Sequence, residues 1–301
     1  MREVDRLRRF LFENAPLRGH WLRLEDAWVQ ARAHQSHPPA VTQLLGEALA
    51  ATSLLAAALK FRGTLTLQIR GEGPLSLLIT QCTHEQDLRG VAQLREDVVV
   101  ADGATLTELV GAGRLVVTVD TEGDAPAWQG IVPLTGTTLA ECLEAYFETS
   151  EQLPTRIVLA ADEHRAAGLL LQKLPTPESA GEGEAGRLRD LWDEAALLLG
   201  TLAGRELLDT EAALLLQRLF AEYDLRLFDG EAVRFRCRCS PERVAGLLQS
   251  LGEQEIRELL AEQGLVTVTC EFCHRPYRYD GIDVAQLFAD RLRPAAPDTL
   301  N

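Results

Sequence analysis

The chain has 301 residues, a length that suits one large domain or two modest ones. Its 30 lysines and arginines stand against 45 acidic residues, and the net charge of −15 argues against a general binder of nucleic acid or of an anionic membrane. The longest strictly apolar run has six residues, Leu54 to Leu59, so the sequence predicts no membrane-spanning helix. The N-terminus also lacks the apolar segment of a secretory signal, and we expect a cytoplasmic protein.

The first 60 residues predict helices. Val4, Leu7, Phe10 and Leu11 recur at helical spacing within residues 2–13. A long helix rich in alanine and leucine is expected over residues 39–61, opened by a pair of prolines.

After Gly63 the apolar period changes to that of a half-buried strand. Leu65, Leu67 and Ile69 alternate with polar residues, and a Gly-Glu-Gly-Pro turn leads to a second strand, which predicts a hairpin over residues 65–80. The pattern predicts further strands at residues 91–94, 98–101, 115–119, 129–133, 156–159 and 169–174, and a helix at 138–149. Strands in one block with flanking helices indicate an α+β core domain of mixed helix and sheet over residues 1–177.

The composition then changes to that of a linker. Residues 178–186 hold three glycines, three glutamates and no large apolar side chain, which favours a flexible segment. One amphipathic helix is expected from Leu188 to Leu202, and a second from Leu208 to Tyr223. Residues 178–230 contain 12 acidic residues and five arginines. This acidic helical linker is either an ordinary helical pair with a solvated face or a metastable segment that can leave its docking surface.

A small domain is expected over residues 231–293, followed by a tail at 294–301. An alternating strand runs into Cys237, and Ser240-Pro241-Glu242 has the residue types that begin a helix. A second helix over 253–262, strands at 265–269 and 277–279 and a last short helix near 284–288 complete the domain.

Four of the six cysteines form two close pairs in this small domain. They are Cys237-x-Cys239 and Cys270-x-x-Cys273. Four thiolates at the ends of strands can converge on one tetrahedral centre, for which zinc is the usual metal. The spacing leaves three interpretations open: a static structural zinc site, a redox-responsive site, and a nucleic-acid-binding ribbon, which the arginines at 234, 236 and 238 favour slightly.

Other candidate sites are weak. His34 and His37 could share a helix face but have no third ligand nearby, and Cys82 and Cys142 are isolated and expected to be buried, inert thiols. The two lysines of the chain follow no phosphate-binding glycine loop. We find no convincing catalytic site and expect no enzyme.

The cysteine segments resemble the C-terminal signature of the redox-regulated 33 kDa chaperonin family, heat shock protein 33. The resemblance rests on Cys237-Arg-Cys239-Ser240 and Cys270-Glu-Phe-Cys273 with Tyr277 after it. Further segments match in the family's order over about residues 4–290: Leu11-Phe-Glu-Asn14, Ala51-Thr-Ser-Leu-Leu55, Leu59-Lys-Phe61, Arg89-Gly-Val91, Tyr146-Phe147, Ser150-Glu-Gln-Leu-Pro-Thr-Arg156 and Leu169-Leu-Leu-Gln172.

The resemblance implies an ATP-independent holdase that is inactive while reduced and loaded with one Zn2+ per chain on the four cysteines. Oxidation would release zinc, form the disulfides Cys237–Cys239 and Cys270–Cys273, and unfold the zinc domain and linker, so that unfolding client proteins bind and aggregation during oxidative stress is prevented. The resemblance also allows a homodimer on activation, and it implies no nucleic-acid or membrane partner. The alternative function from another class is a zinc-ribbon nucleic-acid-binding or regulatory protein, with a thiol–disulfide oxidoreductase as a distant third.

Overall fold

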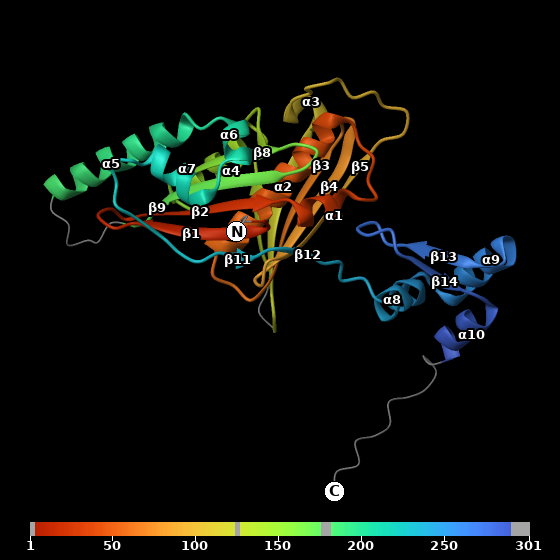
Figure 1. The fold of residues 1–301 in the computed structure, drawn as a ribbon. Coiled ribbons are helices and arrows are strands. Elements are labelled where there is room, and N and C mark those ends of the chain that lie inside the picture. The colour runs from red at the N-terminus through yellow and green to blue at the C-terminus, as the bar shows by residue number, and fades with distance from the viewer. Residues whose placement is uncertain (1–3, 124–126, 176–181, 290–301) are drawn as a thin grey trace, which may run out of the picture. The chain divides into compact units, whose positions relative to one another are not determined.

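The structure is a computed structural model, and it describes residues 4–123, 127–175 and 182–289. The chain divides into two compact units, Met1–Arg236 and Cys237–Asn301, shown in Figure 1.

Two six-stranded sheets build the first unit. The first sheet has the order β10-β1-β2-β9-β8, with β11 also pairing with β1, and the second has the order β12-β5-β4-β3-β6-β7. The strands of the first sheet are β1 (Arg6–Phe12), β2 (Leu17–Leu24), β8 (Thr155–Ala161), β9 (Ala166–Lys173), β10 (Leu225–Leu227) and β11 (Glu231–Ala232). Those of the second are β3 (Gly63–Gly71), β4 (Leu75–Thr83), β5 (Asp87–Leu94), β6 (Gly113–Thr121), β7 (Trp128–Val132) and β12 (Arg234–Phe235).

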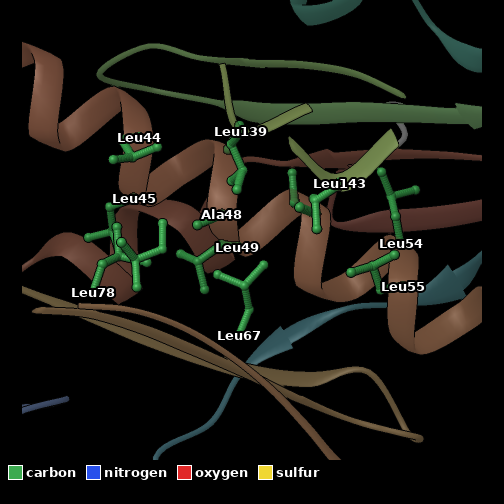
Figure 2. Packing of buried hydrophobic residues seen from close by; sticks show 14 of the residues in the cluster. Leu44, Leu45, Ala48, Leu49, Leu54, Leu55, Leu67, Leu78, Leu139 and Leu143 are labelled. Carbon is green, nitrogen blue, oxygen red and sulfur yellow. The ribbon is translucent and has the colours of Figure 1, made fainter. Parts of the chain in front are cut away.

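The helix α2 (Pro39–Ala58) forms the centre of the main core. It contacts strands of both sheets, and its leucines face Leu67 of β3 and Leu78 of β4 in Figure 2. By length and composition this helix could cross a membrane, but 78% of its most apolar window is buried inside the protein. It is therefore a core helix of the first unit, and the smaller helices α1 (Asp26–Arg32), α3 (Leu106–Val110) and α4 (Leu139–Thr149) surround the same core.

Three further helices cover the other face of the first sheet. They are α5 (Glu182–Gly200), α6 (Gly204–Asp209) and α7 (Ala212–Leu219), seen above β1 and β9 in Figure 1. Trp192, Leu207 and Leu215 of these helices share a second buried cluster with Phe10 and Trp21 of the sheet. The sheet is thus buried on both faces, by α2 on one side and by the helical segment on the other.

The second unit is small. Strands β13 (Val266–Thr269) and β14 (Pro276–Tyr279) form an antiparallel hairpin beside α8 (Pro241–Leu251), α9 (Glu253–Gln263) and α10 (Gly281–Ala289). Its apolar cluster has five buried members, namely Leu248, Ile256, Val266, Val284 and Phe288. A core of this size is marginal for an independent domain, which usually then needs a metal or disulfides.

Most of the predicted elements are confirmed, including the α+β class, the 65–80 hairpin and the helices and strands of the small domain. The helix predicted over residues 2–13 is wrong, because residues 6–12 form β1. Leu7 of this strand is buried in the main core, whereas Phe10 and Phe12 are buried under the helical segment, so both faces are apolar. The strand predicted at 98–101 is also wrong: these residues have no regular structure, and Val99 is 93% exposed.

The linker region also differs from the prediction. Residues 178–181 lie outside the described residues, but 182–186 belong to α5 and are helical. The helix expected from Leu208 to Tyr223 is two helices, separated at Thr210 and Glu211. Residues 231–236, which we assigned to the zinc-binding domain, belong to the first unit, because β11 pairs with β1 and β12 pairs with β5.

Candidate metal centre

The first cysteine pair lies between the end of the first unit and the start of α8. Cys237 follows Arg236, and Ser240 caps α8 by accepting a hydrogen bond from the amide of Arg243 at 3.3 Å. The Arg243 guanidinium donates to the carbonyl oxygen of Arg238 at 3.0 Å. These two bonds fix the short loop that carries both thiols.

The second pair lies in the turn that joins β13 to β14. The amide of Cys270 donates to the carbonyl of Arg275 at 3.0 Å, and the amide of His274 donates to the carbonyl of Cys270 at 2.8 Å. His274 has a left-handed backbone, with φ of 52°. The turn therefore closes tightly, with Cys270 and Cys273 at its two ends.

The structure brings all four predicted ligands together. The Sγ atoms of Cys237 and Cys270 are 3.6 Å apart, those of Cys239 and Cys273 are 3.5 Å apart, and all four lie within 4.8 Å of one another. A zinc ion bound tetrahedrally at about 2.3 Å from each sulfur separates the sulfurs by roughly 3.8 Å. All four thiols are free and partly exposed. The donor set and spacing therefore fit a closed four-sulfur zinc site.

The thiols differ in acidity. Burial by itself would raise the pKa of Cys237, but the amide of Cys239 and the three neighbouring thiols donate to its sulfur and lower its pKa to about 7. Burial raises the pKa of Cys270, and burial together with the other thiols raises the pKa of Cys273 to about 12. One thiolate stabilised by three thiols is the expected state of such a cluster without metal, and a cation would favour ionisation of the rest.

Tyr277 is a residue of this site whose role the sequence did not reveal. It is 7% exposed, and its contact with the Cys239 sulfur, followed by burial, raises the pKa of Tyr277 to about 12. The Arg275 guanidinium lies 5.5 Å from the centre of the Tyr277 ring. The Tyr277 hydroxyl has no hydrogen-bond partner among the described residues, so Tyr277 contributes to the site by packing beside it. The alternation of β14 places Tyr277 on one face of the strand, but only the packing shows that Cys239 lies there.

The remaining candidates are not part of a metal site. Among the residues that the structure describes, the four cysteines are the single group of three or more ligands close enough to hold an ion, so His34 and His37 are not in one. Cys82 and Cys142 are buried, as predicted, and burial raises the pKa of each thiol. Arg236, one of the arginines beside the first cysteine pair, forms an ion pair with Asp87 at 3.0 Å.

Comparison with known proteins gives consistent matches along the chain. The family model described as Hsp33 protein matches residues 5–280. The 33 kDa chaperonin of Nitrosococcus oceani is 44% identical over 299 residues, covering 99% of each chain, and that of Methylobacillus flagellatus is 41% identical, covering 97% of each. The crystal structure of the 33 kDa chaperonin of Thermotoga maritima aligns with a TM-score of 0.79 at 20% identity, covering 96% of this chain and 99% of the other.

Proposed function

Because the chain belongs to the Hsp33 family and is a chaperone by that membership, we propose that it is an ATP-independent holdase switched on by oxidation. In the reduced, inactive form one Zn2+ per chain is held by Cys237, Cys239, Cys270 and Cys273. The observation that carries this proposal is the convergence of these four sulfurs within 4.8 Å in a unit of marginal core.

The metal supplies folding free energy to the second unit. Its apolar cluster has five buried members among the described residues. In such small domains the free energy of metal binding is also free energy of folding, so loss of the metal unfolds the domain. The zinc therefore holds the second unit folded until its ligands are oxidised.

Oxidation removes the ligands by forming two disulfides. We propose the pairs Cys237–Cys239 and Cys270–Cys273. As each pair of thiols forms its S–S bond, it loses two electrons and two protons to one molecule of hydrogen peroxide, whose O–O bond breaks to give two molecules of water. The sulfurs of the disulfide can then no longer hold zinc as thiolates. Loss of one pair is sufficient to open the tetrahedral site.

The client surface comes from the helical segment and the sheet beneath it. The segment α5–α7 buries Trp192, Leu207 and Leu215 against Phe10 and Trp21. Residues 178–230 carry 12 acidic residues and five arginines, so the segment stays soluble when it leaves the sheet. Its undocking exposes apolar surface on both partners, and such surface binds unfolded chains.

The further expectations belong to this proposal. They are a role in the oxidative stress response in the cytoplasm, unfolding proteins as clients, a homodimer on activation, and the absence of nucleic-acid and membrane partners and of enzyme activity.

A light-scattering assay with a thermally unfolding client tests the proposal. The zinc-loaded reduced protein should leave aggregation unchanged, and the peroxide-treated protein should suppress it. Cys142→Ser is the matched control, because this thiol is buried and is not a member of the cluster, and its loss should change neither state. Added ATP should have no effect. Equal suppression by reduced and oxidised protein, or a severalfold gain with ATP alone, would contradict the proposal.

A further inference from the structure

A cavity of about 370 Å³ lies in the first unit. It is lined by residues of β1 and β2, by the end of α2 and the residues after it, by His84 and Gln86 between β4 and β5, and by the chain segment 228–231. Leu7 and Ala56 are buried in its wall, and Phe61 and Phe228 add aromatic surface. Its volume lies in the range of small-molecule sites, and its lining combines these apolar side chains with polar and charged ones.

His20 lines this cavity and is a buried group without an evident structural role. It is 3% exposed, and its Nδ1 has no hydrogen-bond partner among the described residues. Burial, and then the charges of Arg18 and Arg9, lower the pKa of His20 to about 4, so the ring is neutral at pH 7. The charged groups that act on this imidazole are therefore both cations. A neutral imidazole in positive surroundings is suited to donate a hydrogen bond to an anion.

Two cations line the same cavity. Arg9 and Lys60 form no salt bridge within the described part of the chain. The Arg9 guanidinium lies 5.2 Å from the centre of the Phe228 ring, which keeps it at the cavity. His84 also lines the cavity, and its Nδ1 lies 3.1 Å from the amide nitrogen of Gly63.

The exposed side of the cavity limits the charge of a ligand. Asp229 and Glu231 are exposed lining residues and balance Arg9 and Lys60. One negative charge beside His20 is therefore favourable. A second negative charge on the ligand would lie near the carboxylates of Asp229 and Glu231 and be repelled by them. This repulsion selects against ligands of higher charge.

We propose that this cavity binds a small monocarboxylate with an apolar body, such as phenylacetate or isovalerate. The carboxylate accepts hydrogen bonds from His20 and Arg9, and the apolar body packs against Phe61 and Phe228. Inorganic phosphate and citrate fit less well, because they carry more charge and have no apolar body.

Binding is coupled to the docking of residues 228–231, because they form one wall of the cavity. The amide of Phe228 donates to the Arg9 carbonyl at 2.9 Å, and the Arg8 guanidinium donates to the Phe228 carbonyl at 2.9 Å. A ligand that binds only the docked form stabilises that form by mass action. A bound carboxylate should therefore slow activation by peroxide, and this consequence rests on the proposed function.

Calorimetry and NMR on the reduced, zinc-loaded full chain test the site directly. Phenylacetate and isovalerate should bind once per chain, move the His20 ring signals and raise the pKa of His20. Phosphate and citrate should bind at least roughly tenfold more weakly. Arg9→Gln should weaken phenylacetate binding by about tenfold, the typical effect of losing one charge-assisted hydrogen bond.

Arg226→Gln is the matched control. Its guanidinium also lies 5.2 Å from the Phe228 ring centre, but Arg226 does not line the cavity, so its loss should leave the affinity within about twofold. Absence of phenylacetate binding, tighter binding of phosphate, or equal losses in the two arginine variants overturns the proposal. Because binding is measured without oxidant or client, its failure is distinguishable from failure of the proposed switch.

Discussion

An ion pair between buried Arg23 and half-exposed Glu211 fastens the helical segment to the first sheet, and Glu211→Gln tests how much the pair contributes to docking. Arg23 of β2 has a side chain that is 4% exposed, and its Nη2 lies 2.6 Å from a carboxylate oxygen of Glu211. Glu211 is the residue directly before α7. The substitution keeps the size of the side chain and removes its charge.

The expected cost follows from what remains around Arg23. Breaking a buried pair on one side costs about 3–5 kcal/mol when the remaining charge has no other partner. Arg23 keeps Glu25, 3.2 Å from its Nε, and the Glu211 side chain is 42% exposed. Exposed pairs contribute only about 0.2–1 kcal/mol. We therefore expect docking of α6–α7 to weaken by about 1–2 kcal/mol, which raises the open population roughly 5–30-fold.

Native-state hydrogen exchange measures this change at the amide of Leu215, which donates to the Glu211 carbonyl at 2.9 Å. Glu206→Gln is the matched control in the same segment. It removes a contact of 3.7 Å with Arg218 between side chains that are 39% and 57% exposed, and it should cost less than about 0.5 kcal/mol. Equal exchange in the two variants would show that the buried pair does not hold the helices in place.

Other outcomes concern the metal, pH and oxidation. Cys270→Ser should hold no stoichiometric zinc by metal analysis whereas Cys142→Ser should hold one per chain, and zinc retained without Cys270 would contradict the four-sulfur site. Burial raises the pKa of Glu47 from 4.5 to about 7, so the folded state holds this proton more tightly than the unfolded state, and stability falls as pH rises through that window. In denaturant melts the free energy of unfolding of Glu47→Gln should therefore exceed that of the parent by up to about 3 kcal/mol at pH 8 and equal it at pH 4. A difference that does not change with pH would refute this account. After peroxide treatment at mild heat, amide hydrogen exchange should become faster over residues 182–289 and stay slow in β3. If residues 182–289 remain as protected as β3 after zinc is lost, the unfolding switch is excluded.

The sequence predicted an element correctly where the pattern of neighbouring residues alone distinguishes a strand from a helix. The hairpin of β3 and β4 is buried mainly on alternate residues, so the period of two is visible along the sequence. The strand β1 lies between two cores, with Leu7 in one and Phe10 and Phe12 in the other. Burial on both faces removes the alternation that distinguishes a strand from a helix.

The same distinction applies to the candidate site. The four cysteines that the structure brings together were predictable as a candidate metal site, because thiol spacing is a local property and soft ligands select few metals. The roles of Tyr277 and Arg243 were not predictable, since they depend on how α8 packs against the β13–β14 hairpin. One contact of this packing is the hydrogen bond from the Tyr279 hydroxyl to the Pro241 carbonyl at 3.3 Å. The assignment of residues 231–236 also failed for this reason, because their pairing partners lie in β1 and β5.

These short pairings predict an order of events after oxidation. Strands β11 and β12 have two residues each, and the Arg236 side chain that pairs with Asp87 is 66% exposed, so little free energy holds this stretch in place. Cys237 follows it directly, and a metal that holds Cys237 in a folded unit limits the conformations open to the neighbouring chain. Loss of zinc removes that limit at once, whereas α5–α7 are held for longer by an extensive buried cluster and undock afterwards. We therefore expect the amide of Val233, bonded to the Asp5 carbonyl, to lose protection before the amide of Leu215 in α7, as followed by pulsed hydrogen exchange after peroxide. Loss at Leu215 first would mean that the helical segment opens independently of the chain that links it to the zinc-binding unit.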